Sequence, residues 1–243
     1  MHHFRGYRKG RMRSGANAAR ETGGRAPNRK LLVWDFPTRL FHWAAAALVA
    51  LAYATVQMNA MRWHAWFGEA LLALLLFRIA WGFFGSDTAR FSSFLVAPAA
   101  AMRYLARALR LGPDRQTGHN PAGGWMVLLL LALLASETLT GLYIANDVAD
   151  EGPLTDLTPA PIANAITAMH TIFWDALLAA IALHVLAIAL YAVKGHNLLG
   201  PMIGGYKDDL PEGTPAPRMA SGARAMLLLA GSAAVTAALA SFM

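Results

Sequence analysis

The chain has 243 residues, of which 56% are hydrophobic and 14% are charged, and its formal net charge is +7. Soluble domains carry about 25% charged residues, so this composition indicates a membrane protein. The chain contains no cysteine, which excludes disulfides, cysteine-ligated iron–sulfur clusters and thiolate zinc sites. Any bound metal must therefore be held by His, Asp, Glu or Met.

The first thirty residues are strongly basic, with nine Lys or Arg and a single acid, Glu21. A nucleic-acid-binding arm is one interpretation of such a tail. Because an apolar segment follows almost at once, we favour a disordered cytoplasmic tail that sets the orientation in the membrane, with no nucleic-acid partner.

Five apolar segments follow the tail, and each is long enough to cross a bilayer as a helix, which needs about 20 residues. They cover residues 40–58, 63–84, 125–144, 162–193 and 225–243. The sequence therefore predicts an all-α protein that crosses the lipid bilayer several times.

The connections between these segments differ in charge. Lys and Arg gather in the N-terminal tail, between the second and third segments, and after the fourth segment. The connection between the third and fourth segments has four acids and no Lys or Arg. Cytoplasmic loops carry an excess of Lys and Arg, so we expect a multi-pass protein of the bacterial inner membrane with a cytoplasmic N-terminus.

The entry to the first apolar segment reads VWDFPTRLFHW, residues 33–43. Asp35 suits the N-cap of a helix, and Pro37 suits its first turn. We therefore expect a helix to begin directly after Asp35. Trp34 and Trp43 fit the aromatic belt at a membrane interface.

Four of the eight histidines lie in or at the edge of apolar segments, namely His42, His64, His170 and His184. Ionisable side chains are costly inside a bilayer and usually functional there. His170 and His184 are separated by about 21 Å along a helix and by about 40° from a common face. By depth, His42 and His184 lie in the inner half of the membrane, and His64 and His170 lie in the outer half.

Two pairs of imidazoles that face each other across a helix bundle are the arrangement expected for two bis-histidine haems. Such haems would be b-type, because the chain has no CxxCH attachment sequence. A second interpretation is a haem-free transporter that moves a metal ion or protons with histidines and acids. A transporter is expected to gather them at one midplane site, whereas these histidines form two layers. A third is four unrelated histidines, each hydrogen-bonded within the fold.

Several stretches resemble the prokaryotic cytochrome b561 family, which includes the cytochrome b subunits of Ni,Fe-hydrogenases. They are VWDFPTRLFHW at 33–43, HAWFGEALLALLLFRIAWGFFGS at 64–86, GHNPAGG at 118–124 and LTGLY at 139–143. His170 and His184 match the two ligands in the family's fourth span. The resemblance covers residues 31–207.

The resemblance implies a transmembrane four-helix bundle that holds two b haems, to which the C-terminal apolar segment adds a fifth helix. We expect His42 and His184 to ligate the inner haem, and His64 and His170 to ligate the outer haem. The expected regions are the basic tail (1–30), the dihaem domain (31–207), and a linker with the C-terminal helix (208–243).

The family also implies electron transfer across the membrane between the quinone pool and a redox partner. The expected partner is a periplasmic c-type cytochrome or a subunit that resembles a dehydrogenase or hydrogenase. The protein would act either as an electron-transfer protein or as a quinone-linked oxidoreductase, with quinone as a further bound cofactor.

Two arginines lie at the depth of the inner haem. Arg39 is one helical turn before His42, and Arg78 comes late in the second apolar segment. Because Arg binds carboxylates with paired hydrogen bonds, we expect both to bind inner-haem propionates. For Arg39 the alternative is a charge that extends to the membrane surface.

Three acids in or near the outer half of the membrane depart from the family pattern, namely Glu69, Glu137 and Asp175. One interpretation is proton uptake or release near the outer haem, coupled to quinone chemistry. The other is hydrogen bonding between helices by protonated acids.

Overall fold

The computed structural model describes residues 30–108, 116–144, 152–208 and 210–241. Five of its helices are long and apolar enough to cross a membrane: α1 (Phe36–Gln57), α2 (Met61–Phe84), α5 (Pro121–Gly141), α6 (Ala160–Val193) and α8 (Gly222–Ala240). The five predicted segments coincide with these helices apart from a few residues at their ends. Residues 1–29 of the predicted tail (1–30) and residues 145–151 of the acidic connection lie outside the described residues.

Shorter elements join the long helices. They are β1 (Leu31–Leu32), the 3-10 turn η1 (Asp87–Ala89), α3 (Phe91–Phe94), α4 (Pro98–Ala108), the 3-10 turn η2 (Thr155–Leu157), α7 (Leu199–Gly204) and β2 (Tyr206–Lys207). The two strands pair antiparallel, with Leu31 opposite Lys207. This pairing ties the segment after α6 to the segment before α1 at one end of the bundle, which we call the Asp35 end.

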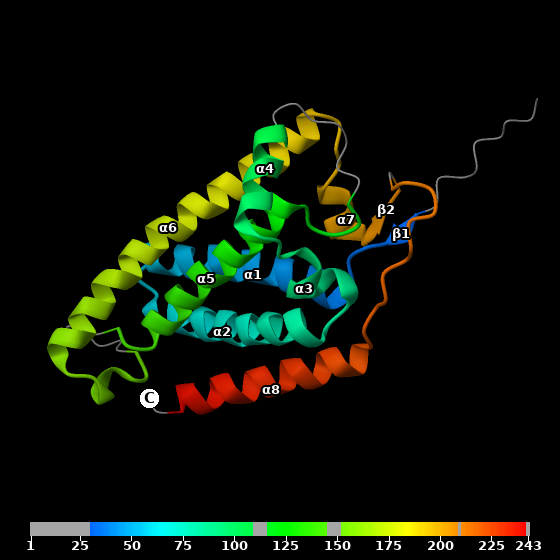
Figure 1. Cartoon of the computed structure of the whole chain (residues 1–243). Helices are drawn as coiled ribbons and strands as arrows, with labels where there is room; N and C mark the ends of the chain where they lie inside the picture. The colour runs from blue at the N-terminus through cyan, green and yellow to red at the C-terminus, as the bar shows by residue number, and fades with distance from the viewer. Residues whose placement is uncertain (1–29, 109–115, 145–151, 209, 242–243) are drawn as a thin grey trace, which may run out of the picture.

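Helix α2 is central to the bundle. It packs against α1, α5 and α8, whereas α6 packs mainly against α5. Figure 1 shows α8 running beside α2, with α6 crossing the other side of the bundle. The fold is therefore a bundle of four helices, α1, α2, α5 and α6, and the fifth long helix covers α2.

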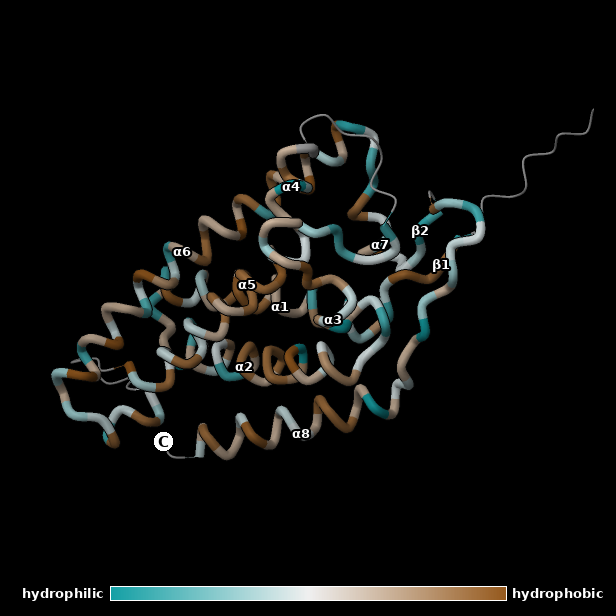
Figure 2. Tube along the Cα trace, in the orientation of Figure 1, coloured by the Kyte–Doolittle hydropathy of each residue, from teal (hydrophilic) through white to brown (hydrophobic). Residues whose placement is uncertain are grey.

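Large apolar side chains are exposed on these helices, and Figure 2 shows the many hydrophobic positions along α6 in brown. Ile172, Val185 and Val193 on α6 are all more than half exposed. Exposing such an apolar surface to water costs free energy, whereas contact with the lipid tails of a bilayer does not. Together with the lengths of the helices, this surface identifies a multi-pass membrane protein.

Leucines from three helices form the main core. Leu71 and Leu75 of α2 pack with Leu131 and Leu134 of α5 and with Leu177 of α6. Apolar residues of α1 between residues 41 and 49 pack against the same cluster. This core occupies the middle of the bundle and leaves its two ends to polar side chains.

The start of α1 is fixed by Asp35, as the sequence predicts. Its Oδ1 accepts a hydrogen bond of 2.7 Å from the backbone N–H of Thr38, and its Oδ2 accepts one of 3.0 Å from Nε1 of Trp81. Asp35 thus caps α1 and joins it to the end of α2. Both partners are buried, so these bonds are shielded from water.

Trp34 corrects one prediction. Rather than lying in an aromatic belt, it is buried, and its ring centroid lies 4.6 Å from that of His119. The backbone of residues 33 and 34 bonds to the carbonyl of Gly205, which turns this segment inward beneath α7. Trp43, by contrast, is 42% exposed, and its Nε1 donates to the Met202 carbonyl.

Candidate functional site

The first histidine pair joins α1 to α6. The ring centroids of His42 and His184 are 6.3 Å apart, and their planes are inclined at 57°. His42 lies two turns into α1, a helix whose start is fixed by the Asp35 cap. The predicted partners at this depth therefore do face each other.

The second pair joins α2 to α6. The ring centroids of His64 and His170 are 6.4 Å apart, with the planes at 87°. His64 lies in the first turn of α2, and its Nδ1 is 3.0 Å from the carbonyl oxygen of Ala52 on α1. The Ala52 carbonyl can only accept, so Nδ1 of His64 is the donor and Nε2 keeps its lone pair.

Both spacings suit one metal ion held between two imidazoles. Metal–nitrogen bonds to histidine are about 2 Å long, so two rings on opposite sides of one ion have centroids roughly 6 Å apart. Neither pair results from close packing of its own two helices, because α1 packs mainly with α2 and α6 packs mainly with α5 in the described part of the chain. A flat group that enters from the side could therefore lie between the rings of each pair.

The two pairs lie on opposite sides of the leucine core. Leu177 of α6 is midway in the sequence between His170 and His184, and it packs with Leu71 and Leu75 of α2. The two histidines of α6 are about 21 Å apart along its axis. The bundle thus carries two similar sites in two layers, one near each end.

A cavity of about 1060 Å³ lies beside the second pair, and His64 and His170 both line it. Pockets for cofactors are commonly about 300–1,000 Å³, so the cavity has room for a large planar group. Apolar and aromatic side chains such as Tyr53 and Trp174 form much of its wall, and their rings stack at 5.3 Å.

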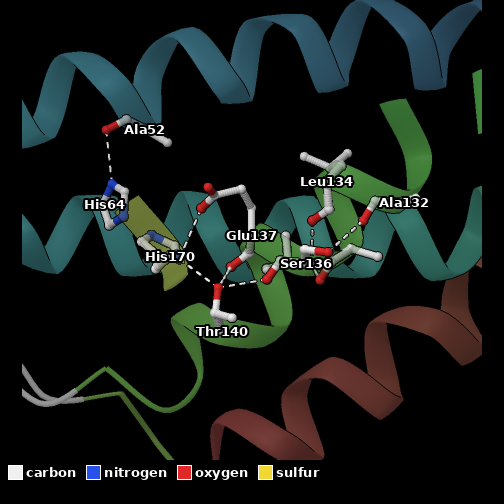
Figure 3. Close-up of polar contacts among 10 residues, drawn as sticks. Ala52, His64, Ala132, Leu134, Ser136, Glu137, Thr140 and His170 are labelled. Atoms are coloured by element: carbon white, nitrogen blue, oxygen red, sulfur yellow. Dashed lines mark hydrogen bonds and ion pairs between the residues drawn. The ribbon is translucent and has the colours of Figure 1, made fainter. Parts of the chain in front are cut away.

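Two of the three predicted acids belong to this cavity. Glu69 and Glu137 line it, whereas Asp175 is exposed on α6. The Oε2 of Glu137 lies 2.9 Å from Nδ1 of His170, and the Oγ1 of Thr140 lies at the same distance from that nitrogen (Figure 3). Thr140 lies in the LTGLY stretch (139–143), but its contact with His170 was not predicted, since no local pattern indicates a contact between α5 and α6.

The Asp35 end has buried polar atoms without hydrogen-bond partners among the described residues. They include Nη1 of Arg78, Nδ1 of His42, Nδ1 of His119 and Oγ1 of Thr38. Arg78 is 3% exposed and forms no salt bridge within the described part of the chain. Its guanidinium lies over the ring of Phe91, and Nη1 keeps an unused hydrogen-bond donor. A buried cation without a salt bridge is costly, so the site suits an anionic group.

His119 lies between the rings of Trp34 and Phe94, at centroid distances of 4.6 and 4.7 Å. Burial, reinforced by the positive charge of Arg78 and by His184 and His42, lowers the pKa of His119 to about 3. Its imidazole is therefore neutral at physiological pH. A neutral ring can still donate one hydrogen bond to an anion.

Arg39 is used differently from Arg78. Its Nη1 donates to the carbonyl oxygen of Ile203 near the end of α7, while its buried Nε has no partner among the described residues. One edge of the guanidinium thus joins α1 to α7, and Nε remains available to bind a ligand. Arg78 has the stronger case for an anion, because it is more deeply buried.

Within the described ranges, no group of three or more His, Asp or Glu residues is placed to hold a metal ion. Two imidazoles alone give an iron two ligands, and a porphyrin supplies the other four. The donor set of each pair thus fits a haem better than a bare divalent ion.

Comparison with protein families adds a decisive observation. The family model described as prokaryotic cytochrome b561 matches residues 33–205. The chain belongs to the prokaryotic cytochrome b561 family. Membership implies binding of b-type haem, and the match includes all four histidines of the two pairs, while α8 follows the matched residues. Comparisons with curated proteins and with solved structures gave no match.

Proposed function

We propose that this membrane cytochrome binds two b haems and transfers electrons across the bilayer between a redox partner and the quinone pool. His42 and His184 would hold one haem, and His64 and His170 would hold the other. The main support is the pair of ring spacings, 6.3 and 6.4 Å, on either side of one apolar core. When bound, the haems supply one-electron iron chemistry.

The chain's own residues orient and insulate these groups. The Ala52 carbonyl fixes the ring of His64, and Thr140 and Glu137 fix the ring of His170. Leucines between the two layers exclude water. Arg78 would bind an inner-haem propionate, because it forms no salt bridge in the described part of the chain and its buried Nη1 has no hydrogen-bond partner there. Arg39 would contribute through its Nε.

The proposed setting is the bacterial inner membrane, with the N-terminus and the Asp35 end cytoplasmic. The charge of the loops supports this orientation. The proposed partners are quinone and a redox protein. The redox protein would be either a periplasmic c-type cytochrome or a subunit that resembles a dehydrogenase or hydrogenase. The tail, the dihaem domain and the C-terminal linker with α8 are proposed as the three regions of the chain.

The deciding experiment is a reduced-minus-oxidised spectrum of the purified protein, combined with a pyridine haemochrome assay. A b-type α band and about two haems per chain would support the proposal. A protein that contains no haem after expression with sufficient haem supply would overturn it.

A second candidate is a haem-free transporter of protons or a metal ion. The observation that favours it is the presence of Glu69 and Glu137 beside two histidines in one cavity. The same purified protein, reconstituted in vesicles with a pH-sensitive dye, separates the candidates. Proton uptake by a haem-free protein would favour transport.

A further inference from the structure

The carboxyl group of Glu137 has one polar partner in the described part of the chain. Glu137 lies on α5 and is 8% exposed. Its Oε2 is 2.9 Å from Nδ1 of His170 on α6, while its buried Oε1 has no hydrogen-bond partner among the described residues. Burying a carboxyl group is costly when few polar partners compensate it, and the contact with His170 is the one that the described residues provide.

The hydroxyl of Thr140 indicates which way the hydrogen bond runs. Its single proton has two possible backbone acceptors, the carbonyls of Ser136 at 2.6 Å and of Glu137 at 3.1 Å. With the proton directed to a carbonyl, Oγ1 can only accept from Nδ1 of His170 at 2.9 Å. Nδ1 therefore carries the proton and donates to both Thr140 and Glu137; Figure 3 marks the two contacts with dashed lines.

This tautomer leaves Nε2 of His170 with a free lone pair, which is what a metal ligand requires. Two of the other histidines have no charged acceptor at Nδ1. Nδ1 of His64 faces a neutral backbone carbonyl, and Nδ1 of His42 is buried without a partner among the described residues. Only His170 has a carboxylate at its Nδ1 in the part of the chain that the structure describes.

A carboxylate that accepts a hydrogen bond from a ligating imidazole makes the ring a stronger electron donor. A stronger donor stabilises ferric iron over ferrous iron and lowers the reduction potential. We propose that Glu137 is a positioning residue that holds His170 in its ligating tautomer and lowers the midpoint potential of the haem held by His64 and His170. This inference rests on the proposed function, since it requires a haem at that pair.

The test substitutes Glu137 with Gln, which keeps the shape and an acceptor oxygen but removes the charge. Spectroscopic redox titrations of the full-length protein would then follow both haems. Glu137→Gln should keep about two haems and shift one reduction equilibrium about tenfold towards the ferrous form, which is about 59 mV for one electron. The other haem should titrate as in the wild type.

Ser136→Ala is the matched control on the same helix, because the hydroxyl of Ser136 donates to the carbonyl of Ala132 and does not contact His170. It should leave both potentials unchanged. Glu137→Asp is the second variant for a Gln protein that fails to accumulate. It withdraws the carboxylate by one methylene and should shift the same potential in the same direction.

Unchanged potentials in a two-haem Glu137→Gln protein would overturn the inference. So would the loss of one haem from that variant, because Glu137 would then serve haem retention rather than potential. If Gln does not accumulate, unchanged potentials in a two-haem Glu137→Asp protein would overturn it equally. Failure of the proposed function is distinguishable, since the wild type itself would then contain no haem.

Discussion

His42 and His184 face each other across the bundle with ring centroids 6.3 Å apart, although their helices belong to different packed pairs. Helix α1 packs with α2, and α6 packs with α5. The close approach of two imidazoles from two such pairs is therefore a property of the site rather than of helix packing. It makes the assignment of ligands to each haem directly testable.

Single substitutions of these two histidines should remove the same haem. In His42→Ala and in His184→Ala, the haem content should fall from about two to about one per chain, because one axial ligand does not retain a bis-histidine haem. The pyridine haemochrome assay and the low-temperature α-band spectrum measure the content and identity of the remaining haem. The doubly substituted protein should lose no more than either single variant.

His196→Ala is the control, since His196 lies after α6 and contacts the ring of Tyr191 rather than another histidine. It should retain both haems. If the two single variants kept spectrally different haems, or the double variant contained none, the pairing of His42 with His184 would be wrong.

Much of this architecture could be predicted from sequence, because lipid imposes strong rules. Every backbone group inside a bilayer must be hydrogen-bonded internally, so long apolar segments become helices, and the five predicted segments did. The depth of His170 and His184 follows from the rise of one helix. The start of α1 followed from Asp35, whose cap is local.

Contacts between distant segments could not be predicted in this way. Trp34 is buried against His119 because α7 and β2 fold back over the start of α1, and no local pattern records that return. The hydrogen bonds from Arg39 to Ile203 and between His170 and Thr140 likewise join separate helices. The sequence could nominate His170 and Arg39 as candidates, but it could not predict the partners that other helices bring to them.

Arg78 offers a second prediction. Arg78→Gln removes a buried positive charge at the Asp35 end, and a nearby positive charge favours the reduced form of a haem. The midpoint potential of one haem should fall by about 59 mV, a tenfold change in its reduction equilibrium. A redox titration measures the shift, and retention of haem during gel filtration measures the loss of the proposed propionate contact.

Arg103→Gln serves as its control, because Arg103 is exposed on α4. This variant should titrate as the wild type does. A fall in both midpoints for Arg78→Gln, or in neither, would argue against a propionate partner near the first pair.

The Asp35 cap leads to a prediction about stability. Asp35→Ala removes an N-cap, at a typical cost of about 1 kcal/mol, and leaves the buried indole N–H of Trp81 without an acceptor, at a further cost of about 1–3 kcal/mol. Thermal unfolding in detergent should show a clearly lower apparent melting temperature. Glu212→Ala is the control, since Glu212 is exposed and should leave it unchanged.

A double-mutant cycle with Trp81→Phe isolates the side-chain bond of 3.0 Å between these residues. Once the donor is removed, Asp35→Ala should cost less, because only the cap is then lost. Fully additive effects would show that Asp35 acts on α1 alone.

His119 yields a pH prediction whose sign follows from its pKa. In the folded protein the pKa of His119 is about 3, far below its ordinary value of 6.5. Between these two pH values, the unfolded chain therefore binds a proton at His119 that the folded chain does not bind. The folded protein is therefore most stable above about pH 6.5, and its free energy of unfolding falls as the pH decreases towards 3, by up to about 1.4 kcal/mol per pH unit. His119→Gln should therefore melt at a less pH-dependent temperature than the wild type between pH 7.5 and pH 5, as measured in detergent.

Arg78, His42 and His184 influence this site but remain in both proteins, so their effects cancel to first order. His196→Gln, in the other Gly-His-Asn sequence, should follow the wild type; equal slopes for all three proteins would contradict a buried, neutral His119.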